Sequence, residues 1–81
     1  MKANRAYELI VRRASRGPAL LADPSRPDTV EVIEVDSGEV VLFWDTLPSL
    51  TGRLVRALRT DLAQLDAEVF LARWQRYEQP R

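Results

Sequence analysis

The chain has 81 residues, of which 46% are hydrophobic and 30% are charged, and its twelve basic residues balance its twelve acidic ones. This composition indicates one small globular domain, and a formal net charge of zero argues against long-range attraction for polyanions. The absence of cysteine excludes disulfide bonds and thiolate metal sites, while the absence of histidine argues against hydrolase, transferase or zinc chemistry.

Charge and hydropathy are distributed unevenly along the chain. Residues 1–17 carry a net charge of +4, residues 18–45 carry −6, and the remainder carries +2, which favours charge complementarity within the chain or between subunits. No stretch approaches the roughly 18 to 20 apolar residues that span a bilayer, and the N-terminal residues lack the apolar core of a signal peptide. We therefore expect a cytoplasmic protein without a membrane segment.

The first element is predicted between Ala3 and Ala14. Apolar residues recur there at helical spacing, with charged residues between them, which predicts a short amphipathic helix. The alternative is a strand over Tyr7–Arg13, because Leu9, Ile10 and Val11 are consecutive and two of them are β-branched. Gly17 and Pro18 end this element in either case.

A short apolar segment and a loop come next. Ala19–Ala22 is a candidate edge strand beside the following hairpin. The segment Asp23–Asp28 contains two prolines and reads as a surface connector, because proline disfavours both helix and central strand.

The segment Thr29–Asp45 carries the strongest structural signal. Two runs rich in β-branched and aromatic residues flank Asp36-Ser37-Gly38, which predicts a β-hairpin. If Gly38 adopts the left-handed conformation, Val35 pairs with Glu39 and one face collects five apolar side chains: Val30, Val32, Val40, Leu42 and Trp44. A two-residue loop at Ser37-Gly38 instead groups Ile33 and Val35 with Val40, Leu42 and Trp44.

Both registers leave apolar residues on both faces of the hairpin. In an antiparallel sheet with one solvent-exposed face, apolar and polar residues alternate more strictly than they do here. We therefore expect each face to be covered, either by the flanking segments or by a second copy of the chain.

The last predicted element is the main helix. Asp45, Thr46 and Ser49 are its candidate N-caps, and Pro48 suits its first turn. An apolar stripe follows at steps of three and four residues from Leu50 to Ala72. The helix either runs unbroken or ends near Asp66, where a second helix begins.

Three arginines on this helix, Arg53, Arg56 and Arg59, project from neighbouring positions at i, i+3 and i+6. We expect them to pair with hairpin carboxylates such as Glu31, Glu34 or Asp45 and to solvate the outer face of the helix. The alternative is an anion-binding surface. Together with Arg12 and Arg13 it forms the hypothesis of a nucleic-acid-binding module, which the zero net charge and the lack of a recognisable motif disfavour.

Aromatic residues supply the second group of candidate site residues. Phe43, Trp44 and Phe70 are expected in the core. Trp74 and Tyr77 lie near the chain end, where a partner protein is in a position to cover them. The candidate partner-binding residues are therefore Trp74, Tyr77, Arg53, Arg56 and Arg59.

The sequence lacks the motifs that carry common chemistry. It contains no nucleophile elbow, no phosphate-binding glycine loop and no carboxylate cluster with metal-loop spacing. We predict no catalytic residues, no cofactor and no metal site.

These observations predict a single α+β domain over residues 1–81. It comprises an N-terminal helix, a β-hairpin with room for a third short edge strand, and a long or broken C-terminal helix packed on the sheet. The expected function is that of a small protein-interaction or accessory domain, which associates with itself or with another protein.

Overall fold

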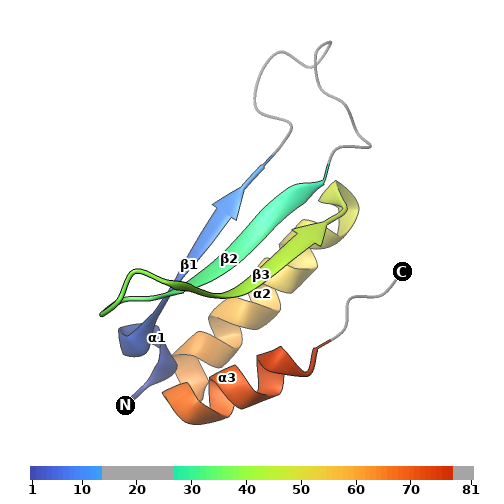
Figure 1. The fold of residues 1–81 in the computed structure, drawn as a ribbon. Helices are drawn as coiled ribbons and strands as arrows, with labels where there is room; N and C mark the ends of the chain where they lie inside the picture. The colour runs from blue at the N-terminus through green and yellow to red at the C-terminus, as the bar shows by residue number, and fades with distance from the viewer. Residues whose placement is uncertain (14–26, 78–81) are drawn as a thin grey trace.

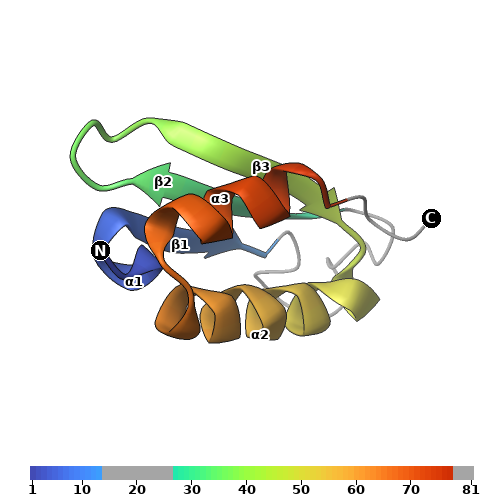
Figure 2. The same ribbon diagram turned by 90° about the horizontal axis from the view of Figure 1, so that it is seen from below.

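The computed structural model describes residues 1–13 and 27–77. A short helix α1 (Ala3–Ala6) leads into strand β1 (Tyr7–Arg12), and β2 (Asp28–Glu34) and β3 (Val40–Thr46) form the hairpin. Helices α2 (Pro48–Gln64) and α3 (Ala67–Gln75) complete the chain. The strands form one antiparallel sheet in the order β1-β2-β3, with α2 and α3 on one side of it (Figures 1 and 2). The predicted α+β class is confirmed.

The helix predicted over Ala3–Ala14 is wrong beyond its first turn. It stops at Ala6, and the strand alternative is correct because Tyr7–Arg12 pairs with β2 from Tyr7↔Glu34 to Arg12↔Thr29. The ladder of backbone hydrogen bonds to β2 overrides the helical spacing of the side chains. This strand is the third strand of the sheet, while the segments 17–18 and 19–22 lie outside the described residues.

The body of the hairpin follows the first predicted register. Val30 pairs with Trp44 and Val32 with Leu42, and Gly38 has the expected positive φ of 73°. The tip differs, because the Val35 N–H donates to the Ala6 carbonyl (2.9 Å) and the Glu34 N–H donates to the Glu39 carbonyl (2.8 Å).

A register shift between Val32 and Ile33 accompanies this tip. Val40 consequently pairs with Ile33 and is 50% exposed, instead of joining Val30 and Val32 on the buried face. The predicted Val35–Glu39 pair and the inward position of Val40 are therefore wrong.

The main helix is broken, as one of the two alternatives predicted. Helix α2 ends at Gln64, and α3 begins after Asp66. The first residues of the chain form backbone hydrogen bonds with the residues between α2 and α3. The Ala3 N–H donates to the Leu65 carbonyl, and the Ala67 N–H donates to the Met1 carbonyl, both at 2.9 Å. These bonds satisfy backbone groups that a helix end otherwise leaves open.

The start of α2 differs from the predicted capping. Leu47 occupies the N-cap position without a side-chain cap bond, so Asp45, Thr46 and Ser49 are not the cap. Pro48 is the first helical residue, as predicted. The Leu47 carbonyl accepts the N–H of Leu50 at 2.8 Å and that of Thr51 at 3.1 Å, which closes the first turn.

The core lies between the inner face of the sheet and the two helices (Figure 2). Phe70, Leu58, Val30 and Val32 are fully buried. The remaining buried apolar residues surround them: Ala3, Tyr7, Leu42, Leu54, Val55, Leu62 and Trp74. Because α3 folds back beside α2, its aromatic residues close the open end of this core.

Tyr7 makes the stability of the fold depend on pH in the alkaline range. Burial raises the pKa of the Tyr7 hydroxyl above its usual 10.0, and the Glu34 and Glu68 carboxylates add to this effect. Because the pKa is higher in the folded chain, deprotonation favours unfolding, and the free energy of unfolding falls as the pH rises through and above 10.0.

We expect a Tyr7→Phe variant to lose part of this alkaline dependence. Urea unfolding of both proteins from about pH 8 to about pH 11 measures it. Parallel pH profiles for the two proteins contradict this assignment.

Candidate functional site

A groove lies between α2 and α3 and has a volume of about 740 Å³. Four arginines line it, Arg53 and Arg56 from α2 together with Arg73 and Arg76 from the end of α3. Ala57, Trp74 and Tyr77 supply the apolar part of its wall. We call this feature the arginine groove.

Helical geometry explains which predicted residues meet in this groove. Residues three apart lie about 60° apart around a helix axis, so Arg53 and Arg56 share a side, as do Arg73 and Arg76. Arg59 is about 120° from Arg53 and instead lines a different hollow beside Tyr7, Glu8 and Val35. Four of the five predicted partner-binding residues therefore come together: Arg53, Arg56, Trp74 and Tyr77.

The two aromatic residues of the groove differ in exposure. Trp74 is only 6% exposed, with its ring packed at 5.8 Å from Trp44 and 4.9 Å from Tyr77. Tyr77 is 37% exposed. A ligand in the groove consequently meets mainly the Tyr77 ring.

Asp61 holds the wall of the groove together. Its Oδ2 accepts a hydrogen bond from Trp74 Nε1 at 3.0 Å and lies 3.5 Å from Arg73 Nε. Sequence reasoning missed Arg73, Arg76 and Asp61 as groove residues. The spacing of Arg73 and Arg76 around Trp74 was a usable signal, but only the turn at Asp66 places α3 beside α2.

The predicted pairing between the helix arginines and the hairpin carboxylates does not form within the described residues. Over residues 1–13 and 27–77, the ion pairs are Arg12–Glu31 (2.7 Å), Arg13–Asp28 (3.7 Å) and Arg73–Asp61 (3.5 Å). Arg12 and Arg13 are thus engaged at the end of β1, far along the sheet from its hairpin tip (Figure 1). The five arginines proposed for nucleic acid occupy three separate places.

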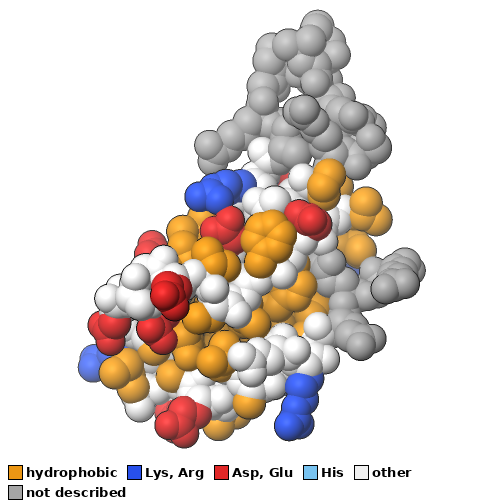
Figure 3. Space-filling model, in the orientation of Figure 1, with side chains coloured by type: hydrophobic (Ala, Val, Ile, Leu, Met, Phe, Trp, Pro, Cys, Tyr) orange, Lys and Arg blue, Asp and Glu red, His pale blue; other side chains and the backbone are white. Residues whose placement is uncertain are grey.

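The outer face of the sheet is the second candidate surface. Strand register directs four apolar residues to this face, where α2 and α3 do not pack: Ile10, Ile33, Val40 and Phe43. We call it the open face. Phe43 is 51% exposed, so its predicted place in the core is wrong, whereas Phe70 is fully buried and Trp44 partly buried. Figure 3 shows hydrophobic side chains lying among acidic and basic ones on the side where the strands lie in front of α2.

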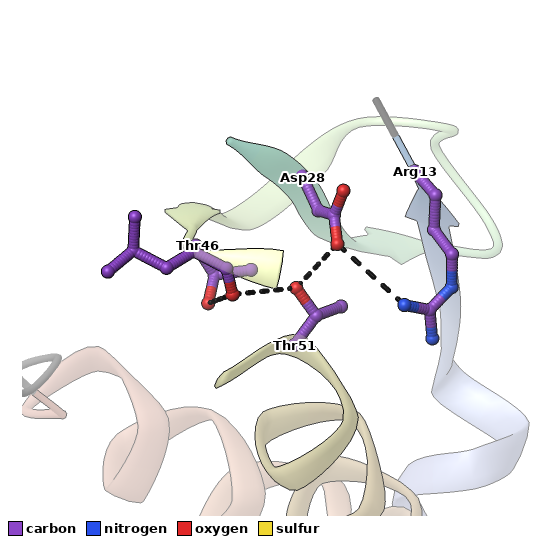
Figure 4. Close-up of polar contacts among 5 residues, drawn as sticks. Arg13, Asp28, Thr46 and Thr51 are labelled. Carbon is purple, nitrogen blue, oxygen red and sulfur yellow. Dashed lines mark hydrogen bonds and ion pairs between the residues drawn. The ribbon is translucent and has the colours of Figure 1, made fainter. Parts of the chain in front are cut away.

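A buried polar cluster joins the sheet to the start of α2 (Figure 4). Asp28 is 1% exposed, and its Oδ2 accepts a hydrogen bond of 2.7 Å from the Thr51 hydroxyl. Arg13 Nη1 lies 3.7 Å from the same oxygen, and the Thr46 hydroxyl approaches the Leu47 carbonyl (3.4 Å). Sequence reasoning had placed Asp28 in a connecting loop, whereas it begins β2 and fixes the position of α2.

Within the described part of the chain, no group of three or more His, Cys, Asp or Glu residues is arranged to hold a metal ion. None of the described helices is both long and apolar enough to span a bilayer. Comparison with protein-family models, curated proteins and solved structures gives no match. The arginine groove and the open face are the two candidate interaction surfaces among the described residues.

Proposed function

We propose that the chain is a small non-catalytic interaction domain that forms a homodimer through the open face. The observation that carries this proposal is the position of Phe43, which is 51% exposed on the sheet face that α2 and α3 leave bare. Val40 is also 50% exposed there, and Ile10 and Ile33 are half-buried. Exposed apolar side chains grouped on the bare face of a small sheet favour an interaction site there.

Charge on the open face favours a second copy as the partner. Strand β1 places Glu8 and Arg12 on either side of Ile10 along this face, about 13 Å apart by the rise of a strand. When two open faces pack together, a two-fold axis near Ile10 and perpendicular to β1 sets Arg12 of each copy against Glu8 of the other. This is the self-complementarity that an isologous dimer needs.

The ion pair between Arg12 and Glu31 is compatible with the same interface. Arg12 Nη1 binds Glu31 at 2.7 Å, yet the Arg12 side chain keeps 65% of its exposure. Its guanidinium therefore retains donors for a second carboxylate. Glu31 lies between Ile10 and Phe43 in the ladder and is paired with Arg12, so its burial in an interface costs less than burial of an unpaired carboxylate.

The test is the dimer dissociation constant of a Phe43→Thr variant. Threonine keeps strand propensity but removes the ring, and each substitution acts twice in a symmetric dimer. Burial of a Phe side chain contributes about 1.5–3 kcal/mol, so we expect dimerisation to weaken by about a hundredfold or more. Sedimentation equilibrium over a wide concentration range measures this change.

The matched control is Val69→Thr, since Val69 is 54% exposed but lies on α3. It should leave the dissociation constant unchanged. A wild-type chain that stays monomeric at millimolar concentration contradicts the proposal, as does equal weakening by both variants.

A further inference from the structure

The arginine groove lies among the helices rather than on the open face, so dimerisation leaves it available. We propose that it binds an acidic peptide segment of a partner protein, with carboxylates between the two arginine pairs and an apolar side chain beside Tyr77. This proposal does not depend on the dimer.

The arginine groove carries an excess of positive charge. Within the described residues, Arg53, Arg56 and Arg76 have no ion-pair partner, while Arg73 lies 3.5 Å from Asp61. The Asp61 carboxylate also accepts the Trp74 indole N–H, so it is engaged with the wall and does not neutralise the other three guanidiniums. Four arginines against one carboxylate make the groove complementary to an anion.

The arginine groove has an apolar extension at one end. The groove continues into a smaller hollow of about 240 Å³ that shares Arg53, Ala57, Trp74 and Tyr77 with it. Leu50 and Leu54 line this extension. A linear segment with acidic residues followed by a large apolar residue matches a basic groove that ends in an apolar hollow.

The residue types favour a peptide over a nucleic acid. The guanidinium fork of arginine binds carboxylate and phosphate oxygens alike, so the aromatic side chains decide between the two partners. Single-stranded nucleic acid instead needs exposed aromatic faces for its bases, and Trp74 is only 6% exposed while Tyr77 is 37% exposed. The zero net charge of the chain further weakens attraction for a polyphosphate.

The experiment titrates ¹⁵N-labelled protein with a short peptide in which aspartate and glutamate residues precede a single phenylalanine. The Trp74 indole signal is the reporter, because its N–H lies in the groove wall bonded to Asp61. The chain has two tryptophans, so a Trp44→Phe variant assigns the signal. Control ligands are the same peptide with amides in place of the carboxylates, the peptide with serine in place of phenylalanine, and oligothymidylate.

The decisive variant carries Arg53→Gln together with Arg56→Gln. Its matched control is Arg59→Gln, because Arg59 lies on the same helix but outside the groove. We expect the acidic peptide to shift the Trp74 signal, and the double variant to weaken binding about tenfold. The control should stay within about twofold, and raising the salt from roughly 0.01 to 0.15 M should weaken binding by the wild type.

Several results overturn the proposal. They are no shift of the Trp74 signal up to the solubility limit of the peptide, equal binding of the amide peptide, or equal weakening by Arg59→Gln. Tighter binding of oligothymidylate than of the peptide assigns the groove to nucleic acid instead. Thermal unfolding of each variant shows whether it is folded, and repeating the titration with Phe43→Thr separates groove binding from dimerisation.

Discussion

Replacing Phe70 by alanine is expected to lower the free energy of unfolding by about 3–5 kcal/mol. The ring is fully buried, stacks 5.7 Å from Tyr7 and lies 6.4 Å from Trp74. Alanine leaves a cavity at the point where α3 meets β1, and the surrounding side chains can fill it only in part. A domain of this size has a total stability of roughly 4–12 kcal/mol, so this loss is a large fraction of the total.

Urea unfolding followed by tryptophan fluorescence measures this loss. Val69→Ala is the matched control, because Val69 is the neighbouring residue and is 54% exposed. Its stability should change by less than about 0.5 kcal/mol. A Phe70→Ala chain that is as stable as this control contradicts the docking of α3 on the core.

Thr51→Val is expected to destabilise the fold by about 1.5–3 kcal/mol. Valine has nearly the same shape as threonine but removes the hydroxyl that donates to Asp28 Oδ2 at 2.7 Å. Both residues are almost completely buried, so water cannot replace the lost bond to the carboxylate. The effect should therefore exceed that of any exposed threonine.

Thr60→Val supplies the comparison, because Thr60 is exposed on the same helix and its hydroxyl donates to the Arg56 carbonyl. A double-mutant cycle with Asp28→Ala, which removes both accepting oxygens, isolates the interaction energy between Thr51 and Asp28. We expect a coupling energy of about 1–2 kcal/mol. Additive effects of Asp28→Ala and Thr51→Val are the result that contradicts a direct bond.

Local patterns were sufficient for two parts of the fold. Alternating β-branched residues and Gly38 specify the body of the hairpin, and Val30↔Trp44 follows the predicted register. Pro48 and the leucine stripe specify the start and the inner side of α2, and Leu65-Asp66 marks its break. In each case the interacting residues are close in sequence, so their spacing carries the information.

The first strand required tertiary information. Residues Tyr7–Arg12 satisfy both helical and extended patterns, and only pairing with β2 decides between them. The same holds at the hairpin tip, where the Val35 N–H is taken by the Ala6 carbonyl. The residues around Val35 indicate Glu39 as its partner and give no sign of Ala6, which is distant in sequence.

The candidate site divides in the same way. The sequence by itself determined that Arg53 and Arg56 share one side of a helix and that Trp74 and Tyr77 lie close together near the end of the chain. Only the tertiary structure decided that these pairs face each other across a groove, joined there by Arg73 and Arg76. The physical reason is the turn after Gln64, held by backbone bonds to Met1 and Ala3 at the opposite end of the chain.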